Sequence, residues 1–439
     1  MTHYQKHYSQ KPRLKRELGL WSTTLIGVGI ILGAGIYALI GEGVAIAGVN
    51  IWISFVIGAI VAAITGLSYA ELSSMLPKAG AEFDYVKTAF SERLGFLAGW
   101  MVICAGIISI ATVALGFGGY FERLTGISAF FAAIGLTVLS ALIVLRGIRE
   151  SANIGTFFTI VETAGLLIII FLGFPLIGSI PLYDAAIPAA NVLGAAALIF
   201  FAFIGFEDIV RLSEETKNPT KTIPKALILA IIISSVLYVL VAIAAISIVN
   251  PNQLAVSSAP LADVASTALG PAGFWVLSLI ALFATGNTVL LFLLVVSRIV
   301  YGMARDNNLP EPLAGINPKT HSPALAIIVC ALISLLFLFV GDISFVANAT
   351  AFLLFAAFVL VNASVIQLRQ KHPGFVRPFR VPISIGKIPV LPVIGILVSV
   401  TLMVSMPLPV IATGIGLTAI GGAYHFSQKK RPILLLPAE

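Results

Sequence analysis

Apolar residues in this chain gather into long runs and do not alternate with polar ones. Runs of about 20 residues recur between charged residues, proline and glycine, and 20 helical residues can cross about 30 Å of hydrocarbon. Only helices and closed barrels satisfy their backbone groups in lipid, and the run at 166–172 lacks the alternation of a barrel strand. The pattern therefore predicts an all-α membrane protein with twelve transmembrane helices. We expect them at 19–41, 51–74, 94–121, 128–146, 153–177, 190–210, 225–249, 273–300, 323–340, 343–368, 389–406 and 408–425.

Composition supports this class. Of the 439 residues, 59% are hydrophobic and 10% are charged, whereas an ordinary soluble domain has about 45–50% apolar and 25% charged residues. This excess of apolar residues excludes a soluble domain and makes the lipid bilayer the principal partner. It also excludes a nucleic-acid-binding protein, despite the net charge of +7.

The basic residues sort to one side of the predicted bundle. Twenty-five of the 26 lysines and arginines fall in tails or loops on that side, and only Arg123 lies on the other. Because cytoplasmic loops carry the excess of lysine and arginine, we expect the tails 1–18 and 426–439 to be cytoplasmic, and the protein to lie in the plasma (inner) membrane. The net positive charge then reflects topology and not a ligand site.

Two predicted spans contain features that could break a helix. The first span carries Gly33-Ala34-Gly35 near its middle, and the sixth carries Gly205 between aromatic residues. One interpretation is a discontinuous helix whose free N–H groups face an anionic substrate group. The other is close helix packing, because Gly29 and Gly33 have the GxxxG spacing. Spans one and six would correspond if the protein consisted of two five-helix halves inserted in opposite directions.

Three acidic residues are candidates for function or structure. Glu162 is expected near the bilayer midplane, where charge is costly, so it could load and release a proton; a fixed hydrogen bond to a neighbouring helix is the alternative. Glu207 follows the presumed break in span six and could act as a gate or simply join an ion-pair cluster with Asp208 and Arg211. Glu71, near the end of span two, is expected to be a solvated or capping residue.

Several motifs resemble those of the amino acid/polyamine/organocation transporters, and most closely their cationic amino acid transporter branch. Residues 29–37, GIILGAGIY, resemble the first-helix signature of the family. Residues 200–207, FFAFIGFE, and the loop through 214–224 resemble its sixth helix and the following loop. Residues 297–310 and Ser322-Pro323 are similar to its eighth helix and exit loop.

The resemblance implies a leucine-transporter-like fold that works by alternating access. Two inverted five-helix repeats would occupy 19–177 and 178–369, and two further helices would occupy 370–425. The substrate carboxylate would meet the N–H groups of Ala34 and Gly35, and its ammonium the carbonyls of Ile31, Phe201 and Ile204. The Phe201 ring would close over the substrate. The expected pocket wall consists of Ile30, Phe203, Thr285, Thr288 and Leu293, with Asn287 nearby.

The chain departs from its relatives at Glu162. Many of them carry a lysine there that is held to stand in for a sodium ion and to titrate during transport. A carboxyl group reverses the charge, so it could carry the proton itself or attract Na⁺.

These features predict a secondary transporter that imports small, mainly neutral L-amino acids, coupled to protons. A cationic amino acid or polyamine transporter, a sodium symporter and an uncoupled exchanger are the alternatives. A channel fits less well, because paired broken helices and one buried acid indicate a substrate site. An enzyme is not expected, because the five histidines lie in tails or loops and no catalytic or metal-binding constellation is visible. We accordingly expect no cofactor and no metal.

Overall fold

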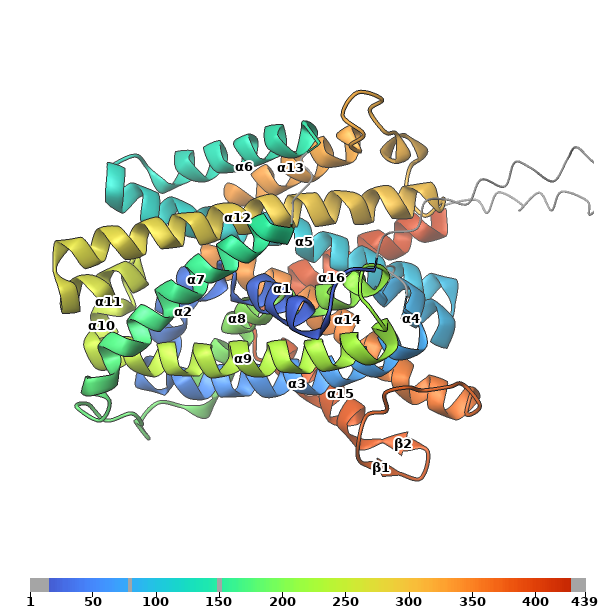
Figure 1. Cartoon of the computed structure of the whole chain (residues 1–439), viewed down its shortest axis with the longest axis horizontal. Helices are drawn as coiled ribbons and strands as arrows, with labels where there is room; N and C mark the ends of the chain where they lie inside the picture. The colour runs from blue at the N-terminus through green and yellow to red at the C-terminus, as the bar shows by residue number, and fades with distance from the viewer. Residues whose placement is uncertain (1–15, 78–80, 148–151, 428–439) are drawn as a thin grey trace, which may run out of the picture.

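The computed structural model describes residues 16–77, 81–147 and 152–427. Most of the two tails, at 1–15 and 428–439, therefore lies outside the described residues, as do the predictions made for them. Within the described ranges the chain is predominantly helical (Figure 1).

The helices follow the predicted apolar runs. The longer ones are α1 (Leu20–Leu32), α2 (Gly35–Ala47), α3 (Ile51–Met75), α5 (Glu92–Thr125), α6 (Ala129–Leu145), α7 (Ala152–Gly173), α8 (Ala189–Ile199), α9 (Pro219–Ile248), α12 (Pro271–Arg305), α13 (Ala324–Leu338), α14 (Ile343–Lys371), α15 (Val390–Val404) and α16 (Leu408–Ser427). Short elements join them: α4 (Ala81–Ala89), α10 (Pro251–Leu254), α11 (Pro260–Leu269), and the strands β1 (Ser384–Ile385) and β2 (Ile388–Pro389). Single 3-10 turns occupy Gly48–Asn50, Phe174–Leu176 and Glu311–Ala314.

Length and composition identify the segments that can cross a membrane. Among the described residues, eight helical segments are long and apolar enough to do so. Four shorter apolar helices, α1, α6, α13 and α15, accompany them. The protein is thus an all-α integral membrane protein.

Most predicted helix ends agree with the structure to within a few residues. The helix α2 continues to Ala47, whereas the predicted span ends at 41, and α9 differs at its start. It begins at Pro219, whereas the apolar run begins at 225. Proline suits the first position of a helix because its missing N–H would have no acceptor there. Asn218 precedes it in a left-handed conformation, with φ of 48°. The first turns of α9 are polar, so they lie outside the apolar run that predicts this helix.

The long helices run side by side along the horizontal axis of Figure 1. α9 lies along α3, and α5 lies against both α12 and α14. α10 and α11 lie at one end of the bundle, and α4 and the β1–β2 hairpin lie at the other (Figure 1). At the α11 end, Arg123 pairs with Asp263 at 3.0 Å.

The short helix α4 follows α3 in the sequence and packs against α5 and α14. Its residues Ala81, Tyr85 and Val86 are fully buried by other parts of the protein. The aromatic and aliphatic side chains of α4 therefore belong to the protein core and not to a lipid-facing surface.

Glu71 differs from the expectation. It is only 1% exposed, and its carboxylate accepts hydrogen bonds from Arg369 at the end of α14, one of them at 2.9 Å from Nε. It also accepts the Val381 N–H at 2.8 Å, and Arg377 Nε lies 3.4 Å away. The loop between α14 and α15 folds back over the end of α3, so the carboxylate is shielded from solvent.

Glu71→Gln should strongly destabilise the protein, because it leaves the buried Arg369 guanidinium without its counter-charge. Removing one partner of a buried ion pair costs about 3–5 kcal/mol. Glu92→Gln is the matched control, because Glu92 is 58% exposed and pairs with Lys87 at 3.5 Å, an arrangement worth at most about 1 kcal/mol. Thermal unfolding of the purified protein in detergent measures both. Equal melting temperatures for the two variants would contradict the assignment.

Candidate functional site at two broken helices

The first predicted break is present in the structure. α1 ends at Leu32 and α2 begins at Gly35, so the chain is not helical at Gly33 and Ala34. No side chain caps α2, and its first residues Gly35 and Ile36 are buried. The first amides of a helix lack intrahelical acceptors. A buried helix N-terminus without a cap is therefore open to an anionic group.

The second break lies at Ile204 and Gly205. α8 ends at Ile199, and 3-10 segments follow at Phe200–Phe203 and Phe206–Glu214. Gly205 has φ of 110°, a conformation that favours glycine, and a Cβ there would lie 2.6 Å from Ile30 Cγ2. The Gly205 N–H donates a 3.0 Å hydrogen bond to the Glu207 carboxylate. Glu207 therefore stabilises the break itself, which neither the gate nor the ion-pair interpretation included.

The two breaks are in direct contact. A Cβ on Gly35 would lie 2.4 Å from the Cα of Ala202, so only glycine permits this approach. The Tyr238 hydroxyl of α9 lies 2.5 Å from the carbonyl oxygen of Ile31 and 2.8 Å from that of Ala202. It has a single proton, so it can donate to only one of these two acceptors at a time.

The structure brings together the five backbone positions that were predicted to bind substrate. These positions lie on two segments, one at each break. The segments touch where Gly35 meets Ala202 and where Gly205 meets Ile30. Two of the three predicted carbonyls already have donors: Ile31 has Tyr238, and Phe201 accepts the Ile204 N–H at 3.2 Å. Each carbonyl oxygen has a second lone pair for a further donor. Substrate binding by these groups stays a prediction.

Three of the five predicted wall residues, Ile30, Phe203 and Thr288, lie at the same junction. Ile30 contacts Gly205, and Thr288 of α12 lies opposite Gly33, where a Cβ would be 3.0 Å from its Oγ1. Thr285 and Leu293 of α12 are completely buried. The Phe203 ring packs against Phe55 and Tyr238, with centroid distances of 6.5 and 5.2 Å.

Both interpretations of the glycines in the first span describe part of the structure. Gly29 faces Thr159 of α7, whereas Gly33 faces Thr288 of α12. The two glycines therefore do not form one GxxxG interface with a single helix. Close packing and the helix break occur together, because the first span packs against both α7 and α12.

Glu162 occupies the middle of the 22-residue helix α7. It is 2% exposed, and the Asn287 side chain of α12 hydrogen-bonds to its carboxyl group. Its Oε1 atom is buried and has no hydrogen-bond partner among the described residues. None of the ion pairs in the described part of the chain includes it. The Tyr37 hydroxyl donates a 2.7 Å hydrogen bond to its main-chain carbonyl.

A small cavity of about 40 Å³ adjoins the second break. Ile204 and Glu207 line it together with Ser109 of α5 and Val296 of α12. At roughly 10–15 Å³ for each water molecule, this volume holds about three or four. An amino acid needs more space than this cavity provides.

Tyr238 and Ala202 were not identified from the sequence. The usable signal was the tyrosine itself, because a hydroxyl in an apolar span needs a hydrogen-bond partner and is placed where one is available. The pairing with Ile31 crosses 207 positions, and no local pattern indicates it.

Tyr238→Phe should lower the stability of the protein by about 1–2 kcal/mol, because two buried carbonyls lose their shared donor. Thermal unfolding of the purified protein checks this. Tyr183→Phe is the control, because Tyr183 is 62% exposed in the loop before α8 and should tolerate the change. An unchanged melting temperature for Tyr238→Phe would show that the hydroxyl does not hold the breaks together.

Comparison with known proteins identifies the family. A family model described as amino acid permease matches residues 18–422. The branched-chain amino acid permease BcaP of Bacillus subtilis is 31% identical, over 91% of this chain and 90% of its own length. The methylthioribose transporter of the same species is 29% identical, over 97% of this chain and 96% of its own. Human cationic amino acid transporter 4 is 28% identical, over 81% of this chain and 60% of its own. The chain therefore belongs to the amino acid permease family, within the amino acid/polyamine/organocation superfamily, and is an amino acid transporter rather than an enzyme.

Proposed function

We propose that this protein imports small neutral L-amino acids, branched aliphatic ones among them, by proton-coupled alternating access across the plasma membrane. The observation that carries the proposal is the uncapped, buried N-terminus of α2 against the second helix break. All α-amino acids share a carboxylate and an ammonium group. Free amides on one segment and carbonyls on the other suit these two charges.

Two inverted repeats would account for the packing of the helices. The first repeat would comprise α1 to α7 and the second α8 to α14, each starting with a broken helix. Helices at equivalent positions then contact each other: α3 with α9, α5 with α12, and α6 with α13. The contact of α1 with α9 likewise matches that of α8 with α3. A two-fold relation between the halves produces such reciprocal contacts.

Twelve spans follow if α1 and α2 form one discontinuous span and α3 forms the next. The shorter apolar helices α6, α13 and α15 would complete the set. The end of the bundle with α4 and the hairpin would be cytoplasmic, because its loops carry Arg146, Lys319 and Lys387, whereas Arg123 lies at the opposite end.

The residues around the junction favour a neutral side chain. Ile30, Phe203 and Leu293 are apolar, and the hydroxyls of Thr285 and Thr288 donate to carbonyls of their own helix at 2.6 and 2.8 Å. A cationic side chain would need a carboxylate, and Glu207 is already engaged with Gly205. The names of the two BcaP relatives, from Bacillus subtilis and Lactococcus lactis, agree with a branched aliphatic substrate.

Counterflow in liposomes tests the substrate class. Purified protein in vesicles loaded with unlabelled leucine should accumulate labelled leucine, isoleucine or valine, because the proposed pocket has backbone groups for both charges and apolar walls. Vesicles without protein are the control. Exclusive transport of lysine, arginine or polyamines would contradict the neutral assignment and make Glu207 the candidate counter-charge.

Glu162 is the proposed coupling site. It lies where α7 meets α1 and α12, and one carboxyl oxygen has no hydrogen-bond partner among the described residues. When protonated, the group is neutral and tolerates this close packing. When deprotonated, its charge needs water, which favours an opened arrangement of the three helices. One proton could thus bias the two states.

Glu162→Gln should abolish substrate accumulation driven by an inward proton gradient, while leucine counterflow continues, because glutamine mimics the protonated acid permanently. Uptake into liposomes with an imposed pH difference and without sodium measures this. Glu311→Gln, in an exposed loop, is the control.

Two results would overturn the proton assignment. If Glu162→Gln still concentrates substrate as the unmodified protein does, the proton passes through another group. If the unmodified protein responds only to a sodium gradient, Glu162 acts as a cation ligand. Counterflow without response to either gradient would indicate an exchanger.

A further inference from the structure

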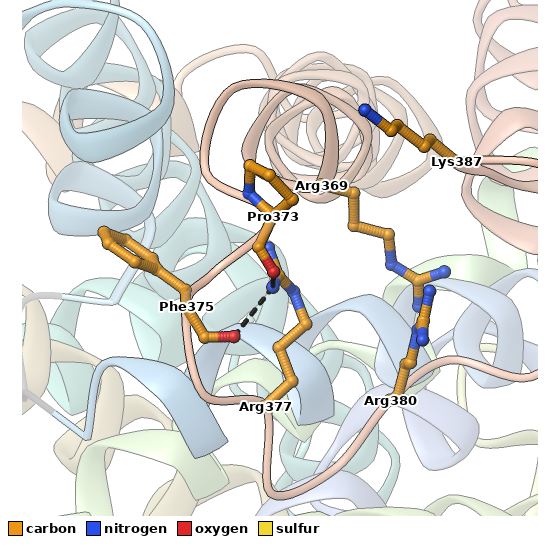
Figure 2. Close-up of a pocket in the computed structure, with 6 residues that line it drawn as sticks. All are labelled: Arg369, Pro373, Phe375, Arg377, Arg380 and Lys387. Atoms are coloured by element: carbon orange, nitrogen blue, oxygen red, sulfur yellow. Dashed lines mark hydrogen bonds between the residues drawn. The ribbon is translucent and has the colours of Figure 1, made fainter.

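A basic cavity lies in the loop between α14 and α15, away from the helix breaks. Its volume is about 320 Å³, which falls in the range of about 300–1,000 Å³ typical of ligand sites. Figure 2 shows its lining: Arg369, Pro373, Phe375, Arg377, Arg380 and Lys387. Four of these six residues are cations, and Glu71 is the one carboxylate that contacts any of them among the described residues. The cavity therefore carries an excess of positive charge.

Two of the four cations are structural. Arg369 donates hydrogen bonds to Glu71, to the Ser384 hydroxyl at 2.7 Å and to the Val381 carbonyl at 2.9 Å. Arg377 donates to the carbonyls of Leu368 and His372 at the end of α14, each at 3.0 Å. It also bonds the Pro373 and Phe375 carbonyls at 3.3 and 2.8 Å, the dashed lines of Figure 2. These two arginines shape the loop.

The other two cations, Arg380 and Lys387, have no such role. Their side chains are in exposed positions and form no hydrogen bond or ion pair with any described residue. Gly386, with φ of 62°, makes the tight connection between β1 and β2 that places Lys387 at the hairpin tip. In Figure 2 the Arg380 side chain extends toward the Arg369 guanidinium, and Lys387 lines the cavity from the hairpin.

The charges around Arg377 also favour an anion at this cavity. Burial, followed by the neighbouring charges of Arg369 and Arg380, lowers the pKa of Arg377, and Glu71 opposes this effect. The cations thus repel one another, and a bound anion would relieve the repulsion.

The surroundings of the cavity distinguish between a lipid and a free anion. The loop joins the ends of two apolar helices, α14 and α15, so the orientation proposed above puts it next to the membrane surface. It also exposes apolar side chains: Val376 is 81% exposed, Ile383 64% and Ile385 77%. Exposed aliphatic residues beside a basic cavity match a ligand with an anionic head and acyl chains.

We propose that this cavity binds the phosphate headgroup of an anionic phospholipid in the cytoplasmic leaflet, with Arg380 and Lys387 as the principal contacts. The side of the membrane rests on the orientation proposed above. Transport itself is not needed for the test, so failure of the transport assignment leaves this proposal standing.

Arg380→Gln/Lys387→Gln should bind phosphatidylglycerol at least about tenfold more weakly than the unmodified protein, because each basic residue at a membrane surface contributes substantially to the attraction. The full-length protein is titrated in detergent with phosphatidylglycerol, and the rise in melting temperature is followed. Lys221→Gln/Lys225→Gln is the matched control: it removes two exposed lysines at the same end of the bundle, at the start of α9. It should retain the full effect. Arg380→Lys/Lys387→Arg keeps the charge and should also retain it.

Three outcomes would overturn the proposal. Equal stabilisation by phosphatidylcholine would show that charge is not recognised. An equal loss in the Lys221/Lys225 variant would show general surface attraction without a site. Saturating stabilisation by inorganic phosphate alone, with no further gain from phosphatidylglycerol, would assign the cavity to a free anion.

Discussion

The hydrogen-bonding of backbone groups within an apolar medium constrains this structure more than any other interaction. A continuous helix meets the requirement by itself, but this protein interrupts two helices side by side in its interior. Tyr238 supplies one donor to the carbonyls of both interrupted segments, and the Glu207 carboxylate accepts an amide of the second. The amides that begin α2 have no comparable partner from a side chain. The first amides of α2 are therefore available to an anionic group, which is the basis of the function proposed above.

Glycine residues allow the two interrupted segments to pack closely against each other. Gly35 lets the backbone of α2 touch that of Ala202, and Gly205 lets the second segment turn beside Ile30. The nearby cavity of about 40 Å³ is too small for an amino acid. Besides packing, the Tyr238 hydroxyl links the two segments. Under the function proposed above, a substrate that binds the first amides of α2 would replace some of these contacts.

The sequence predicted most of the fold, because apolar runs, glycines and the distribution of lysine and arginine are local signals. The breaks at Gly33 and Gly205 were one of two interpretations that these signals left open, and the burial of Glu162 followed from its place inside an apolar run. What the sequence could not indicate were partnerships between distant positions. Glu71 and Arg369 are 298 positions apart, and Glu71 was expected to be solvated because it lies near the end of a predicted span. Tyr238 was one aromatic residue among many until the carbonyls beside it were known. The β1–β2 hairpin is too short to produce a strand pattern.

The buried ion pair at Glu71 also has a mechanical consequence. It ties the end of α3 to the end of α14, and through Val381 it ties both to the loop that leads into α15. A tilt of α3 relative to α14 cannot open this end without exposing or breaking the pair. The pair therefore acts as a pivot. If α3 rotates relative to α14 about this pair, the two helices move apart most at the opposite end of the bundle, where α10 and α11 lie.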